Sequence, residues 1–257
     1  MANAFFDLFD YPGIVFLVSL LAFWGLAWTG AMFWGRHREV QDALHDDFTF
    51  VLGAALTLLG LIIGFTFSMA VSRYDQRKNY EEQEANAIGT EYLRASLLPA
   101  GEAVTVRGLL EKYLAQRLLN YNSRNEVELK EINAQTARLQ NEMWSAVITP
   151  AEVQPTPIAG LVVSGMNDVL NSQGYTQSAW RNRIPTAAWL LLLAICVFCN
   201  LLIGLAARRR TAVFFLILPV ALAICLSLIA DIDSPRRGLI HVRPQNLESL
   251  AESFRSQ

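Results

Sequence analysis

The sequence predicts an all-α, polytopic membrane protein with four transmembrane helices and a helical extramembrane domain inserted between helices two and three. Hydrophobic residues make up 53% of the 257 residues and charged residues only 17%, whereas soluble domains are nearer 45–50% and about 25%. The apolar excess is gathered in four blocks that contain no charged residue, which is typical of membrane spans. The middle of the chain is polar, and its apolar residues recur every three or four positions, as they do on helices.

The first expected span, 12–34, is long enough to cross about 30 Å of hydrocarbon at about 1.5 Å per residue. A cleaved signal peptide has basic residues before its apolar core. Here Asp7 and Asp10 precede the block, and no Lys or Arg does. We therefore expect a transmembrane helix that is retained.

The other three spans are expected at 48–70, 184–207 and 211–230. The last span contains Pro219, which removes a backbone donor, so we expect a kink there. A short link of three arginines, 208–210, separates the third span from the fourth, so these two spans should form an antiparallel hairpin. The residues after them, 231–257, are expected to form a C-terminal tail.

The polar insert, 71–183, is expected to be a small bundle of helices. One helical stripe in it consists of Val106, Leu110, Tyr113, Leu114, Arg117 and Tyr121. Helix breaks are expected at 98–101, at 120–125, at Pro150 and at 155–157, because Pro, Gly and Asn gather there. The second span meets no strong breaker before these positions, so one helix is expected to continue from about residue 48 to about residue 98 and to couple the insert to the membrane.

The second span has one face of small residues. This face consists of Gly53, Thr57, Gly60, Gly64, Ser68 and Ser72, with Phe67 at its flank. The six small residues fall within about 120° of arc, since a helix turns about 100° per residue. Small residues let helices in lipid approach closely, so a tight helix–helix interface is one interpretation. The other is a pore-facing surface with Phe67 as an apolar constriction, and an oligomer can satisfy both.

Charged residues follow the second and fourth spans at what would be one membrane boundary. They are Arg73 and Asp75 after the second span, and Asp231 and Asp233 after the fourth. Arg73 pairing with one of these carboxylates would lock the two spans together. A ring of the carboxylates in an oligomer would instead select ions at a pore mouth.

No residue pattern indicates a catalytic, cofactor or metal site. Cys196 and Cys199 form a CxxC inside an apolar span, where two small hydrophobic residues are the simpler interpretation. The histidines His37, His45 and His241 have no carboxylate or cysteine at metal-binding spacing. A net charge of −2 gives no global attraction for nucleic acid. We expect neither an enzyme nor a bound cofactor.

Two segments, 64–98 and 231–243, resemble a family of uncharacterised bacterial membrane proteins described as bestrophin-like. The layout is similar over nearly the whole chain: two spans, a helical insert, two spans and the Asp-x-Asp-x-Pro tail at 231–235. The more distant resemblance to bestrophins implies a pentameric ion channel, mostly for anions, with the second span at the pore axis and a cytosolic helical domain. Two features depart from that pattern. The proline-and-phenylalanine neck motif is missing from 48–70, and no acidic cluster resembles the bestrophin calcium clasp.

The membrane orientation has arguments on both sides. Arginines are dense in the short loops 35–47 and 206–211, which favours loops in the cytoplasm and both termini outside. More basic residues in total flank the opposite ends of the spans, and the resemblance implies a cytosolic insert. We expect a multi-pass protein of a bacterial inner membrane with its termini outside.

The leading functional hypothesis is a homo-oligomeric ion channel for small inorganic ions, anions in preference to cations, with the second span near the pore axis. The pentamer is expected by analogy alone. The alternative hypothesis is a non-conducting membrane scaffold or sensor whose helical domain binds a partner.

Overall fold

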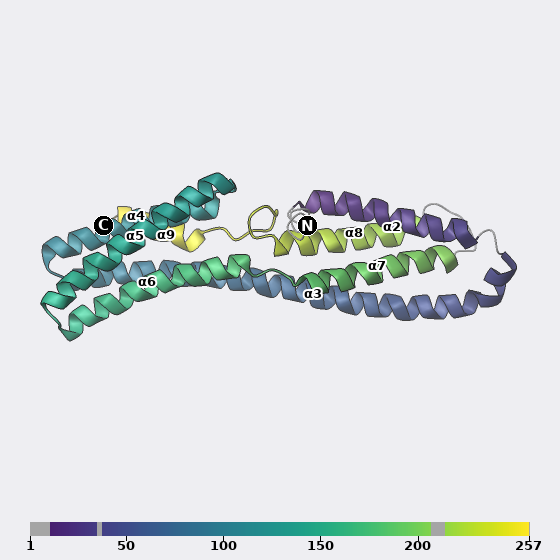
Figure 1. Ribbon diagram of the computed structural model, residues 1–257, viewed down its shortest axis with the longest axis horizontal. Coiled ribbons are helices and arrows are strands. Elements are labelled where there is room, and N and C mark those ends of the chain that lie inside the picture. The colour runs from purple at the N-terminus through teal and green to yellow at the C-terminus, as the bar shows by residue number, and fades with distance from the viewer. Residues whose placement is uncertain (1–10, 35–37, 207–213, 257) are drawn as a thin grey trace. The chain divides into compact units, whose positions relative to one another are not determined.

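The computed structural model describes residues 11–34, 38–206 and 214–256, and in this part of the chain it contains helices and no strand. The predicted all-α fold class is therefore confirmed. The helices are α2 (Pro12–Trp34), α3 (Arg38–Arg94), the 3-10 turn η1 (Ala95–Leu97), α4 (Ala100–Asn122), α5 (Glu126–Val153), α6 (Pro157–Arg181), α7 (Thr186–Ala206), α8 (Phe214–Asp233) and α9 (Gln245–Arg255) (Figure 1). The arginines at 36 and 208–210, used above to argue orientation, lie outside the described residues.

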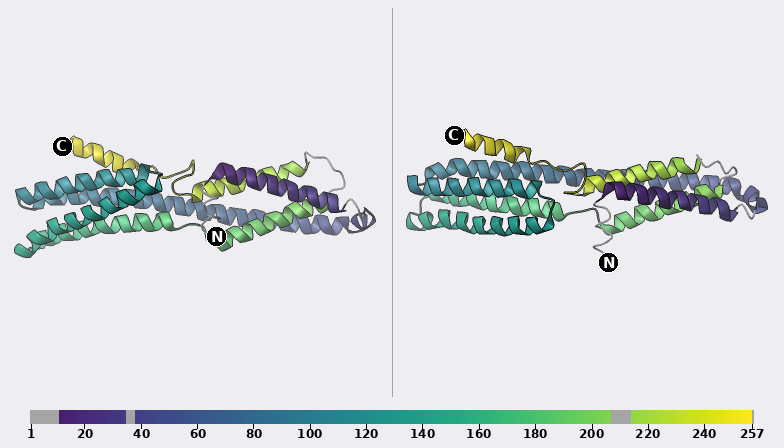
Figure 2. Two further views of the ribbon diagram at one scale, coloured as in Figure 1. Left: turned by 45° about the horizontal axis from the view of Figure 1, so that its top comes forward. Right: turned by 90° about the horizontal axis from the view of Figure 1, so that it is seen from above.

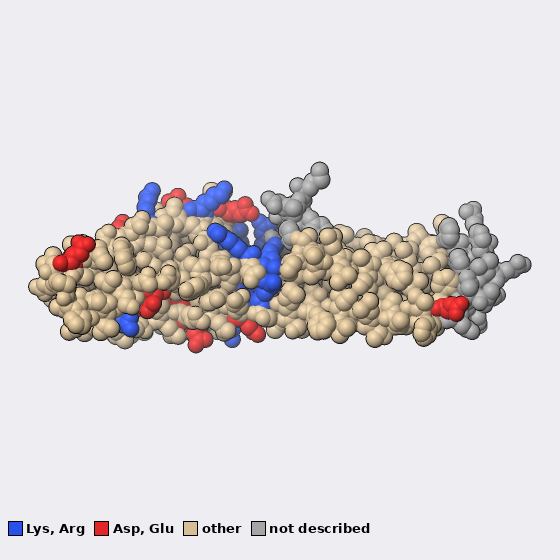
Figure 3. Space-filling model, turned by 60° about the horizontal axis from the view of Figure 1, so that its bottom comes forward, with Lys and Arg blue, Asp and Glu red and all other residues tan. Residues whose placement is uncertain are grey.

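Four helical stretches among the described residues are long and apolar enough to cross a membrane. They are Pro12–Met32, Asp47–Leu97, Pro157–Ala206 and Phe215–Asp233. The apolar parts of these stretches overlap the four expected spans and carry no charged side chain. In Figure 3 the unit that holds α2, α7 and α8 is almost wholly tan, whereas Lys, Arg, Asp and Glu side chains lie over the unit that holds α4, α5 and α6.

The chain forms two compact units, and the first contains the spans (residues 1–74 and 183–241). Within it α2 packs against both α7 and α8. The core of this unit draws on all four spans, with Phe23 from α2, Leu59 from α3, Trp189 from α7 and Leu226 from α8 each buried. The packing that holds the spans together is thus apolar side chains from every helix.

Helices α2 and α7 approach each other closely where glycine faces glycine. A Cβ added to Gly30 would lie 2.8 Å from the carbonyl oxygen of Leu201 and 3.2 Å from the Cα of Gly204. A Cβ added to Gly204 would meet the backbone carbonyl of Ala27 in the same way. Because the obstacles are backbone atoms, neither helix can tolerate a side chain here without moving away.

The second unit (residues 75–182 and 242–257) is the helical insert together with the end of the tail. Its core contains the predicted stripe of α4, in which Val106, Leu110, Tyr113 and Leu114 are buried. Side chains cap two of its helices: the Asn125 carboxamide oxygen accepts from Val127 N–H at 2.9 Å, and the Thr156 hydroxyl accepts from Ala159 N–H at 3.1 Å.

The helical insert and the tail differ from the expectations at Pro150 and at the C-terminus. Pro150 lies inside α5, and the helix ends three residues later at Val153. A proline in the last turn disturbs only the backbone before it, and its own carbonyl still accepts the N–H of Gln154 at 3.0 Å. The C-terminal tail also holds an unforeseen helix, α9, which packs against α4.

Helix α3 is one uninterrupted helix of 57 residues, or about 85 Å at 1.5 Å per residue. It passes from the apolar run into the polar insert without a break, as the sequence predicts, and begins at Arg38, ten residues before the expected start. Figure 2 shows the same helix from two further directions. The last residues of α3 therefore contribute to the core of the helical insert, while its apolar part contributes to the membrane unit.

Candidate functional site

The candidate site is the small-residue face of α3. All seven predicted residues are exposed in the single chain: Gly53, Thr57, Gly60, Gly64, Phe67, Ser68 and Ser72. The buried residues of the same segment are Leu59, Thr66 and Ala70. At about 100° per residue these three point to roughly the opposite side of the helix from the small residues. The packing of the spans therefore uses one side of α3 and leaves the small-residue face uncovered.

The glycines of this face serve no contact within the chain. A Cβ added to Gly53, Gly60 or Gly64 would meet no atom within 4 Å, in contrast to Gly30 and Gly204. Close packing inside one chain is thus no reason for glycine at these three positions. The Thr57 hydroxyl donates to the Gly53 carbonyl at 2.9 Å, so it is satisfied within its own helix and adds only weak polarity to the surface.

Bulky apolar side chains lie on and beside the small-residue face of α3. Phe50, Leu61 and Phe65 are each more than half exposed. Such side chains are compatible with lipid or with a neighbouring chain. The small residues among them leave room for close approach of another helix or for an open axial path.

The four predicted boundary charges lie in different surroundings. Asp231 is buried, and its carboxylate accepts the backbone N–H groups of Leu239 at 2.6 Å and Ile240 at 3.0 Å. Asp233 is buried too and accepts the N–H of Ile184 at 3.0 Å, just before α7 begins. Arg73 Nε is buried without a hydrogen-bond partner, and Asp75 is exposed.

These contacts give the Asp-x-Asp motif a structural role. Asp231 holds the turn that follows α8, and a Cβ at Gly238 would lie 2.5 Å from the Asp231 carbonyl oxygen, so the turn needs glycine there. Asp233 ties the end of α8 to the segment that enters α7. Both carboxylates therefore compensate their burial with backbone donors.

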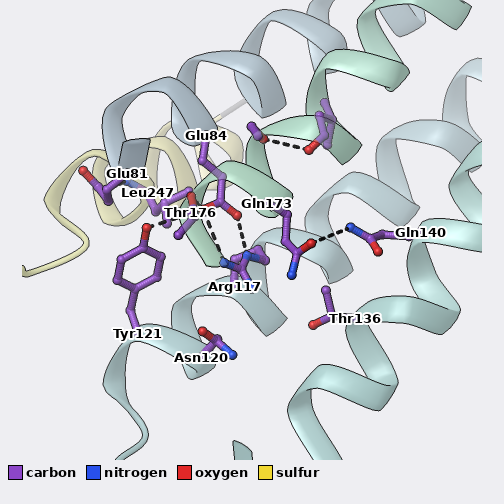
Figure 4. A network of polar contacts seen from close by, with 12 residues as sticks. Glu81, Glu84, Arg117, Asn120, Tyr121, Thr136, Gln140, Gln173, Thr176 and Leu247 are labelled. Atoms are coloured by element: carbon purple, nitrogen blue, oxygen red, sulfur yellow. Dashed lines mark hydrogen bonds and ion pairs between the residues drawn. The ribbon is translucent and has the colours of Figure 1, made fainter. Parts of the chain in front are cut away.

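A buried polar network in the second unit was missed by the sequence reasoning. The Glu84 carboxylate of α3 forms an ion pair with Arg117 of α4 and accepts hydrogen bonds from the hydroxyl groups of Thr176 at 3.0 Å and Tyr121 at 3.4 Å (Figure 4). Glu84 and Arg117 are almost fully buried. The one sequence signal was Arg117, a charged residue in an otherwise apolar helical stripe.

The buried network raises the pKa values of two tyrosines and of Arg117. Burial, and secondly the negative charge of Glu84, raise the pKa of Tyr113, and the same two causes raise the pKa of Tyr121. Burial opposes the charge of Arg117, but Glu84 outweighs it and raises the pKa of the guanidinium. Tyr113 and Tyr121 therefore stay neutral and Arg117 stays positively charged at neutral pH, which suits a structural network rather than proton transfer.

No group of three or more His, Cys, Asp or Glu side chains in the described part of the chain is arranged to hold a metal ion. His37 and the side chain of His45 lie outside that part.

Comparison with known proteins gives one family. A family model described as the Bestrophin-like domain matches residues 17–247. No match was found among the curated proteins.

The solved structures that resemble the chain are bacterial membrane proteins. A single-residue variant of a bacterial bestrophin homologue from Klebsiella pneumoniae has a TM-score of 0.68 and 15% identity, with 94% of this chain and 98% of that chain covered. The same homologue, solved by zinc phasing, has a TM-score of 0.65 and 13% identity, with 93% and 97% covered. At these identities the likeness concerns the fold.

Proposed function

The chain belongs to the bestrophin-like family, and on that premise we propose that it is an oligomeric ion channel of a bacterial inner membrane, with α3 near the pore axis. The observation that carries the proposal is the uncovered small-residue face of α3. Only 6% of the most apolar window of the α3 span is buried within the chain, against 33%, 39% and 50% for the other spans. Because the other helices of the chain cover so little of this span, a neighbouring copy or a pore can lie against it.

The chemistry of the face suits a water-filled path better than contact with lipid. Thr57, Ser68 and Ser72 bring hydroxyl groups to the face, and Gly60 and Gly64 have no side chain that projects from it. Phe67, which is 38% exposed, supplies an apolar ring at its flank. Weakly polar walls with one apolar constriction are a common way to build a gated pore. We place the narrowest part near Gly60, Gly64, Phe67 and Ser68.

The partner implied by this face is a second copy of the chain. One copy presents a single stripe, so several copies around an axis are needed to enclose a path. The resemblance to bestrophins suggests five copies and a preference for anions over cations. Reversal potentials under an asymmetric chloride gradient test the ion preference: a potential close to that of chloride supports it, and one close to that of the cation contradicts it.

Ion flux into liposomes tests the proposed function. The purified protein should conduct, and Gly64→Leu should block or strongly reduce flux, because the leucine would project from the α3 face. Phe67→Ala should raise basal flux by removing the constriction. Gly25→Leu is the matched control, because it places the same side chain at a glycine of α2 that also has open space around it.

Flux that is absent from the folded oligomer, or that responds equally to Gly64→Leu and Gly25→Leu, would contradict the channel. The second candidate, a non-conducting scaffold or sensor, rests on exposed apolar side chains of the helical insert, among them Leu93, Val127 and Val153. That candidate predicts loss of partner binding, with no change of flux, when these side chains are made polar.

The orientation is a separate proposal. The arginine-rich short loops favour both termini outside, and we propose that arrangement. An alkaline phosphatase fused to the C-terminus should then be active. A C-terminal green fluorescent protein that is bright in cells would place the termini and the helical insert in the cytoplasm, as the resemblance to bestrophins implies.

A further inference from the structure

One acidic side chain of the helical insert is buried with no partner. Glu91 of α3 has none of its surface exposed, and neither carboxylate oxygen has a hydrogen-bond partner. The other buried glutamates of α3 differ: Glu84 has Arg117, and Glu81 accepts three hydrogen bonds from the start of α9. Glu91 therefore has no hydrogen bond that offsets the cost of burying its charge.

The surroundings of Glu91 are shaped to receive its carboxyl group. Gly165 of α6 faces it, and a Cβ added there would overlap the Glu91 Oε2 atom and would lie 2.5 Å from Nη1 of Arg94. Ile88 of α3 and Ala95 of η1, three residues before and four residues after Glu91, are fully buried. The carboxyl group thus sits at the packing contact between α3 and α6, with the Arg94 guanidinium beside it.

Two charges among the described residues act on this carboxyl group. Burial is the largest influence and raises the pKa of Glu91 from 4.5 to about 8. Arg94 on the same helix lowers the pKa, and Asp168 on α6 raises it. The side chain is therefore largely a neutral carboxylic acid at neutral pH, which is how an unpartnered buried acid avoids the cost of charge.

We propose that Glu91 is a proton-sensing group of the helical insert: it packs against Gly165 as a neutral acid, and its ionisation in mildly alkaline solution loosens the contact between α3 and α6. An ionised carboxylate in this place would have no hydrogen bond, and it would face the like charge of Asp168 across the contact with α6, with only Arg94 of its own helix to oppose that repulsion. Since α3 also carries the small-residue face, the ionisation of Glu91 changes the packing of the same helix that we assign to the pore. The inference does not depend on conduction, because it concerns the insert alone.

Infrared spectroscopy of the full-length protein tests the protonation. The carboxylic-acid C=O band should be present at neutral pH and disappear with a midpoint near pH 8. Glu91→Gln should abolish the band, while Glu82→Gln, at an exposed glutamate of the same helix, should leave it. Asp168→Asn should lower the midpoint and Arg94→Gln should raise it. A wild-type protein without the band at neutral pH, or a band that survives in Glu91→Gln, would overturn the proposal.

Hydrogen–deuterium exchange tests the loosening of the contact. After correction for intrinsic exchange, amides of α6 around Gly165 should exchange faster above the midpoint in the wild type and not in Glu91→Gln. Equal pH dependence in both proteins would overturn this part. If Glu91→Gln does not fold, the wild-type titration and the Asp168→Asn shift still decide the matter.

Discussion

At the scale of single residues, the helical insert and its neighbours show three ways to bury an acid. Glu84 is neutralised by Arg117, Asp231 accepts backbone N–H groups, and Glu91 is left to bind a proton. The first two carboxyl groups have an arginine or backbone donors in contact, whereas Glu91 has no hydrogen-bond partner. Buried acids in one fold can therefore have quite different responses to mutation and to pH.

The sequence could not reveal these partners. Glu84 lies 33 positions from Arg117 and 92 from Thr176, and such pairs form only when the helices are in place. A polar residue in an apolar stripe, such as Arg117, indicates that a buried partner exists but not which one it is. The Asp231 and Asp233 motif was noticed as a pair of boundary charges, and its bonds to backbone groups depend on the turn that follows.

The buried ion pair leads to the first residue-scale prediction. Glu84→Gln leaves Arg117 charged and buried, and we expect the free energy of unfolding to fall by about 3–5 kcal/mol. Denaturant unfolding of the purified protein measures this, with exposed Glu82→Gln as the control. Equal stability of the two variants would mean that the pair contributes little to the fold.

Glu91 leads to a prediction of pH dependence with a definite sign. The pKa is higher in the folded chain, about 8, than the ordinary 4.5, so the folded state holds a proton that the unfolded state releases. This contribution to stability is complete below about pH 4.5, declines as the pH rises, and is lost above about pH 8. Unfolding midpoints of Glu91→Gln should lack this decline. A parallel decline in wild type and variant would show that other groups cause it.

At the scale of elements, α3 combines what the sequence could and could not predict. The sequence predicted that α3 continues from the apolar run into the insert, because no helix breaker lies between them. It did not predict that α3 begins at Arg38, because that segment is polar and has no clear capping signal. Helix α9 was missed, although Leu247, Leu250, Ala251 and Phe254 follow helical spacing. Its short length and polar composition made it look like a tail, and only its contacts hold it in place.

The contact between α2 and α7 gives an element-scale prediction. Gly30→Ala places a methyl group against backbone atoms of α7, so the helices must separate, at a cost of about 1–3 kcal/mol. Gly25→Ala lies on the same helix with open space around it and should change little. Thermal unfolding in detergent compares the two variants. A Gly30→Ala protein as stable as Gly25→Ala would show that the two helices separate easily.

The start of α9 gives a second prediction at this scale. Glu81 caps it by accepting the N–H groups of Asn246 and Leu247, both at 3.0 Å. Removing such a cap costs on the order of 1 kcal/mol. In Glu81→Ala, amides of 245–255 should lose protection from hydrogen exchange, and in Glu82→Ala they should not. Unchanged protection would leave the stacking of Tyr92 on Phe254, with ring centroids 3.9 Å apart, as the main contact.

At the scale of the whole molecule, the sequence predicted the fold class and the family, because both follow from apolar blocks and motifs within one chain. Assembly does not follow from one chain. What the structure adds is that the small-residue face of α3, from Gly53 to Ser72, is not used for packing inside the chain. Helix packing within one chain therefore does not explain the small residues of this face. Two explanations remain: contact between copies of the chain, and a path for ions.

Electron microscopy of the assembled protein in lipid nanodiscs tests the central claim most directly. The account predicts a ring of several copies in which Gly60, Gly64 and Ser68 of every α3 face the symmetry axis or the adjacent copy. A monomer, a dimer, or a ring in which these three residues face lipid at the periphery would contradict it.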